Sequence, residues 1–216
     1  MKTETLLGDL ADDDEIALKR FVDHGYLKQL TQEILDDESR LAAIAERSCE
    51  HVNGFSLIQL RPLEAPYERL RLHFYESECL VGDPHTHRWS FSSVILDGQL
   101  DHEIFEESGQ GEDFLRTECL PKRHGFHLQD ETPVQLANTW KAVHRPGDSY
   151  KLAGHEIHRF GPGAKIQSMS LVMQRQPFTA ASRVYIKPGG QMGTGEMGAI
   201  LPERLQSILL RLKKLL

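Results

Sequence analysis

The stretch Gly82-Asp83-Pro84-His85-Thr86-His87-Arg88-Trp89-Ser90-Phe91-Ser92-Ser93-Val94-Ile95-Leu96-Asp97-Gly98 decides the predicted fold of this 216-residue chain. Two histidines one residue apart follow a proline and precede a strand-forming run that ends in Asp-Gly. Because side chains alternate between the two faces of a strand, His85 and His87 are predicted to point the same way. The pair therefore offers two imidazole ligands to a metal ion.

A third imidazole is offered by the stretch Pro146-Gly147-Asp148-Ser149-Tyr150-Lys151-Leu152-Ala153-Gly154-His155-Glu156-Ile157-His158-Arg159-Phe160. His155 and His158 are three residues apart, so a strand would place them on opposite faces and only one could join the first pair. The Ile-His-Arg-Phe context favours His158. The spacing is one residue short of the His-Glu-x-x-His pattern of helical metalloproteases. We predict a metal centre of His85, His87 and His158; the alternative is three structural histidines.

Together the two stretches resemble the paired motifs of the cupin superfamily, in which a His-x-His strand leads to a Gly-closed hairpin and a later Pro-Gly-Asp…Ile-His strand completes the site. The resemblance covers roughly residues 66–176. It implies a jelly-roll β-barrel, and it maps the family pattern onto His85, His87 and Gly98 in the first motif and Pro146, Gly147, Asp148 and His158 in the second.

One departure from the cupin pattern concerns the metal. Many cupins carry a glutamate four to six residues after the second histidine, where this chain has Phe91, Ser92 and Ser93. The site therefore resembles the three-histidine iron centres of thiol dioxygenases and β-diketone dioxygenases, which implies Fe(II); by residue type, Zn, Ni or Mn would also fit. Thiol dioxygenases carry a Ser-His-Tyr series on the late strand. The comparable run 168–174 keeps serines without that histidine and tyrosine, which leaves thiol specificity open.

An all-β fold is predicted because many short strand-like runs alternate with Gly, Pro and Asp breaks. Asp97-Gly98 predicts a hairpin, since this dipeptide tolerates the positive φ of a tight turn. Segments Ser108–Asp113 and Pro121–Pro133 are polar and predicted to be loops. The predicted strands are Phe55–Leu60, Leu70–Tyr75, Trp89–Leu96, Gln99–Phe105, Val134–Val143, Ser149–Leu152 and Ile166–Met173, with a further short run at 183–187.

Both ends of the chain are predicted to be helical. Residues 12–48 show helical spacing over two or three helices, with the acids Asp12 to Glu15 at a solvated helix start. A closing helix begins at Pro202. Its apolar face is predicted to dock on the barrel or on a partner subunit, which would make a homodimer. We divide the chain into a helical extension (1–53), a cupin barrel (54–187), and a Gly-rich link with the final helix (188–216).

The run Arg69–Tyr75 has period two, which places Arg71, His73 and Tyr75 on one face and Leu70, Leu72 and Phe74 on the other. If the polar face looks into the barrel, Arg71 could grip a substrate carboxylate, with His73 and Tyr75 as donors beside it. The alternative places this face in solvent.

The residues that flank the histidines are predicted to be structural. Arg88 and Arg159 each follow a ligand directly, so alternation turns them away from the metal and towards ion pairs. Trp89, Phe91 and His102 could line a pocket, although aromatic positions in strands are more often core.

The composition describes one soluble domain, with 39% hydrophobic and 26% charged residues. A formal net charge of −7 without a long basic run excludes a nucleic-acid footprint and favours a small-molecule partner.

The acidic start and the lack of a long apolar run argue against a signal peptide and a membrane span, so we expect a cytoplasmic protein. The cysteines, Cys49, Cys79 and Cys119, show no disulfide or zinc spacing and are expected to be reduced.

The function expected from these features is that of a non-haem iron dioxygenase acting on a small organic acid or thiol, with O2 as co-substrate. A metal-dependent isomerase or lyase and a non-catalytic, ligand-sensing cupin are the alternatives.

Overall fold

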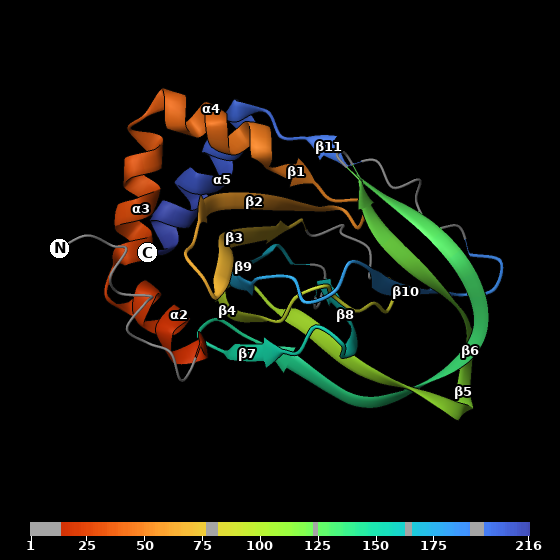
Figure 1. The fold of residues 1–216 in the computed structure, drawn as a ribbon. Helices are drawn as coiled ribbons and strands as arrows, with labels where there is room; N and C mark the ends of the chain where they lie inside the picture. The colour runs from red at the N-terminus through yellow and green to blue at the C-terminus, as the bar shows by residue number, and fades with distance from the viewer. Residues whose placement is uncertain (1–13, 77–81, 123–124, 163–165, 191–196) are drawn as a thin grey trace.

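The computed structural model describes residues 14–76, 82–122, 125–162, 166–190 and 197–216 (Figure 1). Within these ranges, three helices precede the strands and one follows them. The elements, in chain order, are α2 (Asp14–Asp23), α3 (Tyr26–Leu35), α4 (Glu38–Arg47), β1 (Cys49–Glu50), β2 (Phe55–Pro62), β3 (Tyr67–Tyr75), β4 (Phe91–Asp97), β5 (Leu100–Lys122), β6 (Gly125–His144), β7 (Ser149–Leu152), β8 (Ile157–Pro162), β9 (Ser168–Arg175), β10 (Ser182–Ile186), β11 (Gly198–Ala199) and α5 (Pro202–Leu215).

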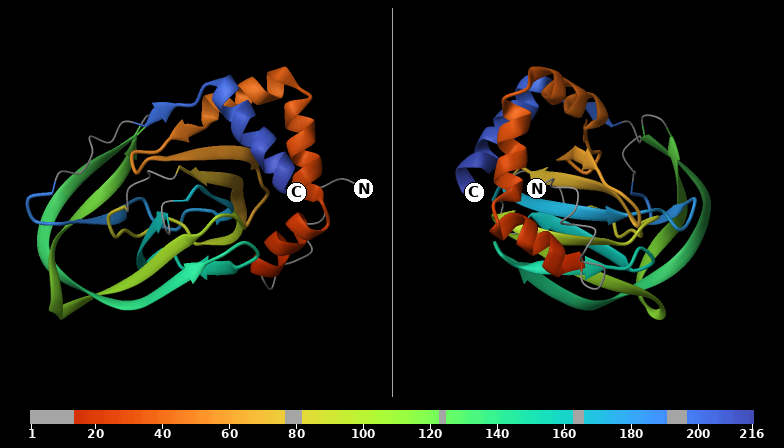
Figure 2. Two further views of the ribbon diagram at one scale, coloured as in Figure 1. Left: turned by 180° about the vertical axis from the view of Figure 1, so that it is seen from behind. Right: turned by 60° about the vertical axis from the view of Figure 1, so that its left-hand side comes forward.

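The strands form two antiparallel sheets, which makes the fold a mostly β jelly roll, as predicted. The larger sheet has the order β11-β1-β2-β3-β9-β4-β7, and the smaller has the order β10-β5-β6 with β8 also paired to β5. The long β5–β6 ribbon curves around one side of the molecule, whereas helices α2 to α5 gather on the opposite side, over the larger sheet (Figures 1 and 2).

Strand β3 lies inside the larger sheet, between β2 and β9, and both of its faces are covered. Leu70, Leu72 and Phe74 belong to the core between this sheet and the helices, together with Leu18, Ile34 and Leu209. The opposite face, which carries Arg71 and His73, looks into the space between the two sheets. Neither face of β3 is solvent, so the solvent alternative for this polar face does not hold.

Helix α2 is held on the larger sheet by Asp14, which is 1% exposed. Its carboxylate accepts hydrogen bonds from the Tyr67 hydroxyl at 2.8 Å and from the Arg175 guanidinium at 2.7 Å. Burial by itself would raise the pKa of Asp14, but the hydrogen bonds from Arg175 and Tyr67 outweigh it and lower the pKa. The predicted solvated helix start is therefore wrong for Asp14; Asp12 and Asp13 lie outside the described residues.

The two predicted loops, Ser108–Asp113 and Pro121–Pro133, are largely strand. β5 and β6 pair from Leu100–His144 to Lys122–Gly125, with register shifts such as the one between Glu107 and Glu112. The prediction failed because these segments are exposed on an outer ribbon, where strand residues need not be apolar. Cross-strand hydrogen bonding is enough to order them.

The turn at Asp97-Gly98 forms with Gly98 at φ 73, but it does not close a hairpin. β4 pairs with β7 and β9 in the larger sheet, whereas β5 pairs with β6, β8 and β10 in the smaller one. The turn thus carries the chain from one sheet to the other. The Asp-Gly sequence determines that the chain turns here. Contacts with strands distant in the sequence determine which strands β5 pairs with.

Elements from the two ends of the described part of the chain pack together beside the larger sheet. β1 pairs with β11, and α5 packs with α3 and α4 through buried Leu205, Ile208, Leu209 and Leu212. The apolar face of α5 thus docks on its own chain. No helix among the described residues is long and apolar enough to cross a membrane.

Candidate metal centre and pocket

The His-x-His segment lies between β8 and β10. The backbones of His85 and His158 exchange two hydrogen bonds, at 2.8 and 3.0 Å, while the Tyr185 N–H donates to the Pro84 carbonyl at 2.9 Å. His85 forms isolated bridges to His158 and Val184, so the predicted regular strand at 85–87 is a short bridging segment instead. The cross-strand exchange places residues 85 and 158 side by side, which no local pattern specifies.

Three imidazoles converge at this point. Among the described residues, His85, His87 and His158 form the one group of His, Cys, Asp or Glu side chains whose potential ligand atoms suit a metal, all within 4.8 Å of one another. Nε2 of His87 and Nε2 of His158 lie 2.7 Å apart. Two neighbouring ligands that bind one ion at about 2.1 Å are separated by roughly 3 Å, so these nitrogens fit a shared ion.

The second ring nitrogen of His85 supports the same assignment. Nδ1 of His85 is 2.8 Å from the Asp83 carbonyl oxygen, to which it donates when protonated, and this leaves Nε2 for the metal. Burial lowers the pKa of all three histidines, and that of His87 and His158 falls well below the usual range. Each ring is therefore neutral at pH 7, the form that binds a metal.

The alternative ligand His155 lies on the turn before β8 and is exposed. His158 is 1% exposed, and its ring centroid lies 4.7 Å from that of His85. His155 is therefore exposed to solvent, whereas His158 belongs to the three-histidine cluster.

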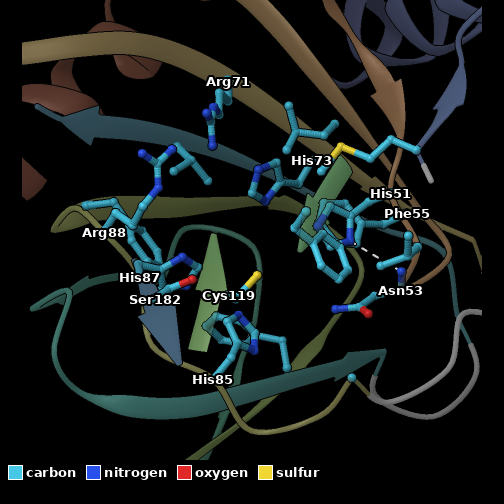
Figure 3. Close-up of a pocket in the computed structure, with 18 of the residues that line it drawn as sticks. His51, Asn53, Phe55, Arg71, His73, His85, His87, Arg88, Cys119 and Ser182 are labelled. Atoms are coloured by element: carbon cyan, nitrogen blue, oxygen red, sulfur yellow. Dashed lines mark hydrogen bonds between the residues drawn. The ribbon is translucent and has the colours of Figure 1, made fainter. Parts of the chain in front are cut away.

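A cavity of about 490 Å³ opens beside the three histidines, between the two sheets (Figure 3). Its wall includes Arg71, His73 and Tyr75 from β3, the three residues predicted from alternation. Their catalytic roles remain a prediction, but all three lie in the cavity that the metal cluster also lines. Cys49 and Cys119 line the same cavity as free thiols, and burial raises their pKa. Cys79 lies outside the described residues.

One wall of the cavity is a row of rings. His51 stacks on Phe55 at 4.6 Å between centroids, Phe55 stacks on Tyr75 at 4.9 Å, and His73 lies 5.0 Å from Phe55. Burial lowers the pKa of His51 to about 4 and that of His73 to about 3. His51 follows β1 and has no motif around it, so the sequence alone predicted an ordinary surface or packing residue there.

Trp89 and Arg88 also line the cavity. The guanidinium carbons of Arg71 and Arg88 lie 5.1 and 5.0 Å from the centre of the Trp89 indole. The expectation that Arg88 turns away to an ion pair is wrong, because the segment after His87 does not continue as a strand and the alternation is lost. Arg159 does pair with a carboxylate, that of Glu103.

Behind His158 lies a second histidine pair, which no motif in the sequence predicts. Nδ1 of His102 and Nε2 of His144 are 3.1 Å apart, and both residues are buried. The His102 ring lies 5.4 Å from that of His158 and 4.1 Å from Phe160. Among the described residues, Nδ1 of His158 and Nε2 of His102 are buried without a hydrogen-bond partner.

No family model and no curated protein matches this sequence. The solved structures that resemble the chain include cupin-superfamily proteins and dioxygenases. Hydroquinone 1,2-dioxygenase PnpCD in complex with Cd2+ and 4-hydroxybenzonitrile is 16% identical over 56% of this chain and 63% of that one, with a TM-score of 0.35. Hydroquinone 1,2-dioxygenase from Sphingomonas sp. TTNP3 with 4-hydroxybenzoate bound is 12% identical over 55% and 64%, with a TM-score of 0.36.

A cupin superfamily protein from Desulfitobacterium hafniense is 12% identical over 57% of this chain and 78% of that chain, with a TM-score of 0.33. This chain thus spans less than two thirds of the two hydroquinone dioxygenase chains.

Proposed function

We propose that this protein is a cupin-type metalloenzyme in which His85, His87 and His158 hold one divalent metal ion, Fe(II) in the native state, and that it acts as a dioxygenase on a small organic acid or thiol. The observation that carries the proposal is the convergence of three neutral imidazoles on the wall of one cavity. Zn, Ni and Mn suit the same ligands and are the competing metals.

The ligand set leaves room for a substrate. When bound, the ion would act as a Lewis acid and redox centre, and three protein ligands would leave coordination positions open. Asp83 is the one carboxylate among the described cavity-lining residues, and its backbone carbonyl oxygen faces Nδ1 of His85. A centre without a carboxylate ligand keeps the full charge of the ion, which favours an anionic substrate.

The residues of β3 would position that substrate. Arg71 is 9% exposed and presents its guanidinium to the cavity, where it would hold an acidic group. His73 is neutral at pH 7, so it would place the substrate through a hydrogen bond without adding charge. Tyr75 would contribute its ring to the same wall.

The test begins with metal analysis of untagged protein, followed by O2 uptake on the Fe(II)-loaded enzyme with a panel of organic acids and thiols. We expect one metal ion per chain and O2 consumption that matches product formation, with both oxygen atoms in the product. The matched control is His155→Ala, which removes an exposed imidazole and should leave metal content and O2 uptake unchanged.

Other outcomes would select other functions. Turnover that continues without O2 would replace the dioxygenase by an isomerase or lyase, in which the ion serves as a Lewis acid alone. Metal binding and ligand binding with no turnover would identify a sensing protein. Protein that binds no divalent metal would overturn the proposal as a whole.

A further inference from the structure

We propose that the cavity is selective for planar, aromatic acids, with Arg71 and Arg88 over Trp89 as the site for the anionic group and the rings of His51, Phe55 and His73 as the site for the planar body. The inference deepens the proposed function by naming the substrate class. Its geometry, however, is independent of the metal chemistry.

The wall of the cavity carries an excess of positively charged side chains. Four described cationic side chains line the cavity, Arg69, Arg71, Arg88 and Lys122, against the single carboxylate of Asp83. This excess of positive charge contrasts with a formal net charge of −7 for the whole chain. Arg69 is paired with Glu68, but no carboxylate of the described residues pairs with Arg71 or Arg88. A buried, unpaired cation is costly unless an anion completes it.

The guanidinium groups of Arg71 and Arg88 both lie near Trp89. Both guanidinium carbons lie about 5 Å from the centre of the Trp89 indole, so the two cations share one aromatic neighbour. Nε of Arg71 is buried and has no hydrogen-bond partner among the described residues. Burial lowers the pKa of Arg71 to about 9, which still leaves the group charged at pH 7. Two guanidiniums on the same side of the pocket suit the oxygens of one carboxylate.

The wall opposite Arg71 and Arg88 is formed by aromatic rings. Figure 3 shows Arg71 and Arg88 on one side of the pocket and His51 with Phe55 on the other, with His73 between them. His51 and His73 are neutral at pH 7 because burial lowers their pKa to about 4 and about 3, so this wall presents flat, uncharged rings. Such a surface favours a planar apolar body, since aromatic rings prefer stacked or edge-to-face neighbours.

Three small probes test the anion site and the ring site separately. They are benzoate, its neutral amide benzamide, and the aliphatic acid hexanoate. We expect wild-type protein to bind benzoate at least about tenfold more tightly than either of the others, measured by calorimetry. Arg71→Met and Arg88→Met, which keep a flexible side chain and remove the charge, should each weaken benzoate about tenfold and leave benzamide unchanged. Arg145→Met, at an exposed position, is the matched control.

Each alternative result would count against the site. Benzoate affinity that survives both Arg71→Met and Arg88→Met would overturn the anion site, and hexanoate that binds as tightly as benzoate would overturn the selectivity for rings. Arg88 is only partly buried, so Arg88→Met keeps the test informative should Arg71→Met not fold.

The measurements are made on chelator-treated protein and again on Zn-loaded protein. Benzoate binding that requires Zn and ignores both arginines would place the carboxylate on the metal and overturn the inference. The dioxygenase proposal fails by a different result, which is the absence of O2 uptake by Fe(II)-loaded protein. That result would not change the measured affinities for benzoate, benzamide and hexanoate.

Discussion

The orientation of single imidazole rings defines the candidate metal centre. His85 is oriented by the Asp83 carbonyl through Nδ1, and the Nε2 atoms of His87 and His158 face each other at 2.7 Å. Neutral rings at such a distance exchange a single hydrogen bond, so a metal ion that binds both would replace one hydrogen bond by two coordinate bonds. Each ring is therefore expected to matter to metal affinity, while a histidine outside the cluster should not.

We predict that His85→Ala, His87→Ala and His158→Ala each reduce bound metal to a small fraction of the wild-type content. The loss of one of three ligands weakens the chelate, so the two remaining imidazoles hold the ion much less tightly. Metal per chain, measured after dialysis against a weak chelator, decides it. His155→Ala is the control, because His155 is exposed and outside the cluster. Loss of metal in His155→Ala with retention in His158→Ala would reverse the ligand assignment.

Turns and helices position the site without touching it. The turn at Gly98 brings β5 into the smaller sheet, where β5 pairs with β8, the strand that carries His158. Helix α5 covers the outer face of the larger sheet through Leu205, Ile208, Leu209 and Leu212, so that the polar face of β3 is the one that lines the cavity.

Gly98→Ala should destabilise the protein by about 1–3 kcal/mol, because alanine rarely adopts a positive φ. A Cβ at Gly98 would lie 2.1 Å from the Gln167 carbonyl oxygen, and the residue has φ +73. Gly109→Ala is the matched control, since a Cβ there meets nothing within 4 Å. Urea unfolding of the two variants measures the difference. Equal stability of both would mean that the turn relaxes without cost.

Leu209→Ala should cost about 2–5 kcal/mol, because it opens a cavity in the core between α5 and the larger sheet. Leu209 is fully buried, whereas its neighbour Leu210 is 45% exposed. Leu210→Ala should therefore change the free energy of unfolding by less than about 0.5 kcal/mol. A large effect of Leu210→Ala would place this face of α5 in an interface between subunits, which thermal unfolding at several protein concentrations would reveal.

The folded protein buries several histidines in their neutral form. Burial lowers the pKa of His51 to about 4 and of His73 and His102 to about 3. In the unfolded chain these groups titrate near 6.5. Folding therefore excludes protons that the unfolded chain would bind in acid, and stability depends on pH in a direction that these shifts determine.

We predict that the free energy of unfolding of the metal-free protein is nearly constant above about pH 6.5 and falls as the pH drops from there towards 5. Each of these histidines contributes a slope that approaches about 1.4 kcal/mol per pH unit, because the unfolded state binds the extra proton. Urea unfolding at pH 7.5, 6.5, 5.75 and 5 measures the slope. His51→Gln should reduce the slope and the exposed-site control His155→Gln should not. A flat profile from pH 7.5 to 5 would contradict the neutral, buried state of these rings.

The sequence by itself determined the elements that depend on near neighbours along the chain. Alternation and turn chemistry predicted β2, β3, β4 and β7 within a few residues, and the helical spacing predicted α5 from Pro202. The two histidine motifs, through their resemblance to the cupin pattern, predicted which imidazoles the structure brings together, although no local pattern specifies that His85 and His158 lie side by side.

Only the tertiary structure decided which face of β3 meets the cavity, where Arg88 points, and that His51 and His102 lie near the metal cluster. A period of two is the same whichever face is covered, and the choice was made by helices α2 to α5 packing on Leu70, Leu72 and Phe74. The partner strand of β5 was decided in the same way. These features arise from contacts between residues far apart in the chain, and no local pattern encodes them.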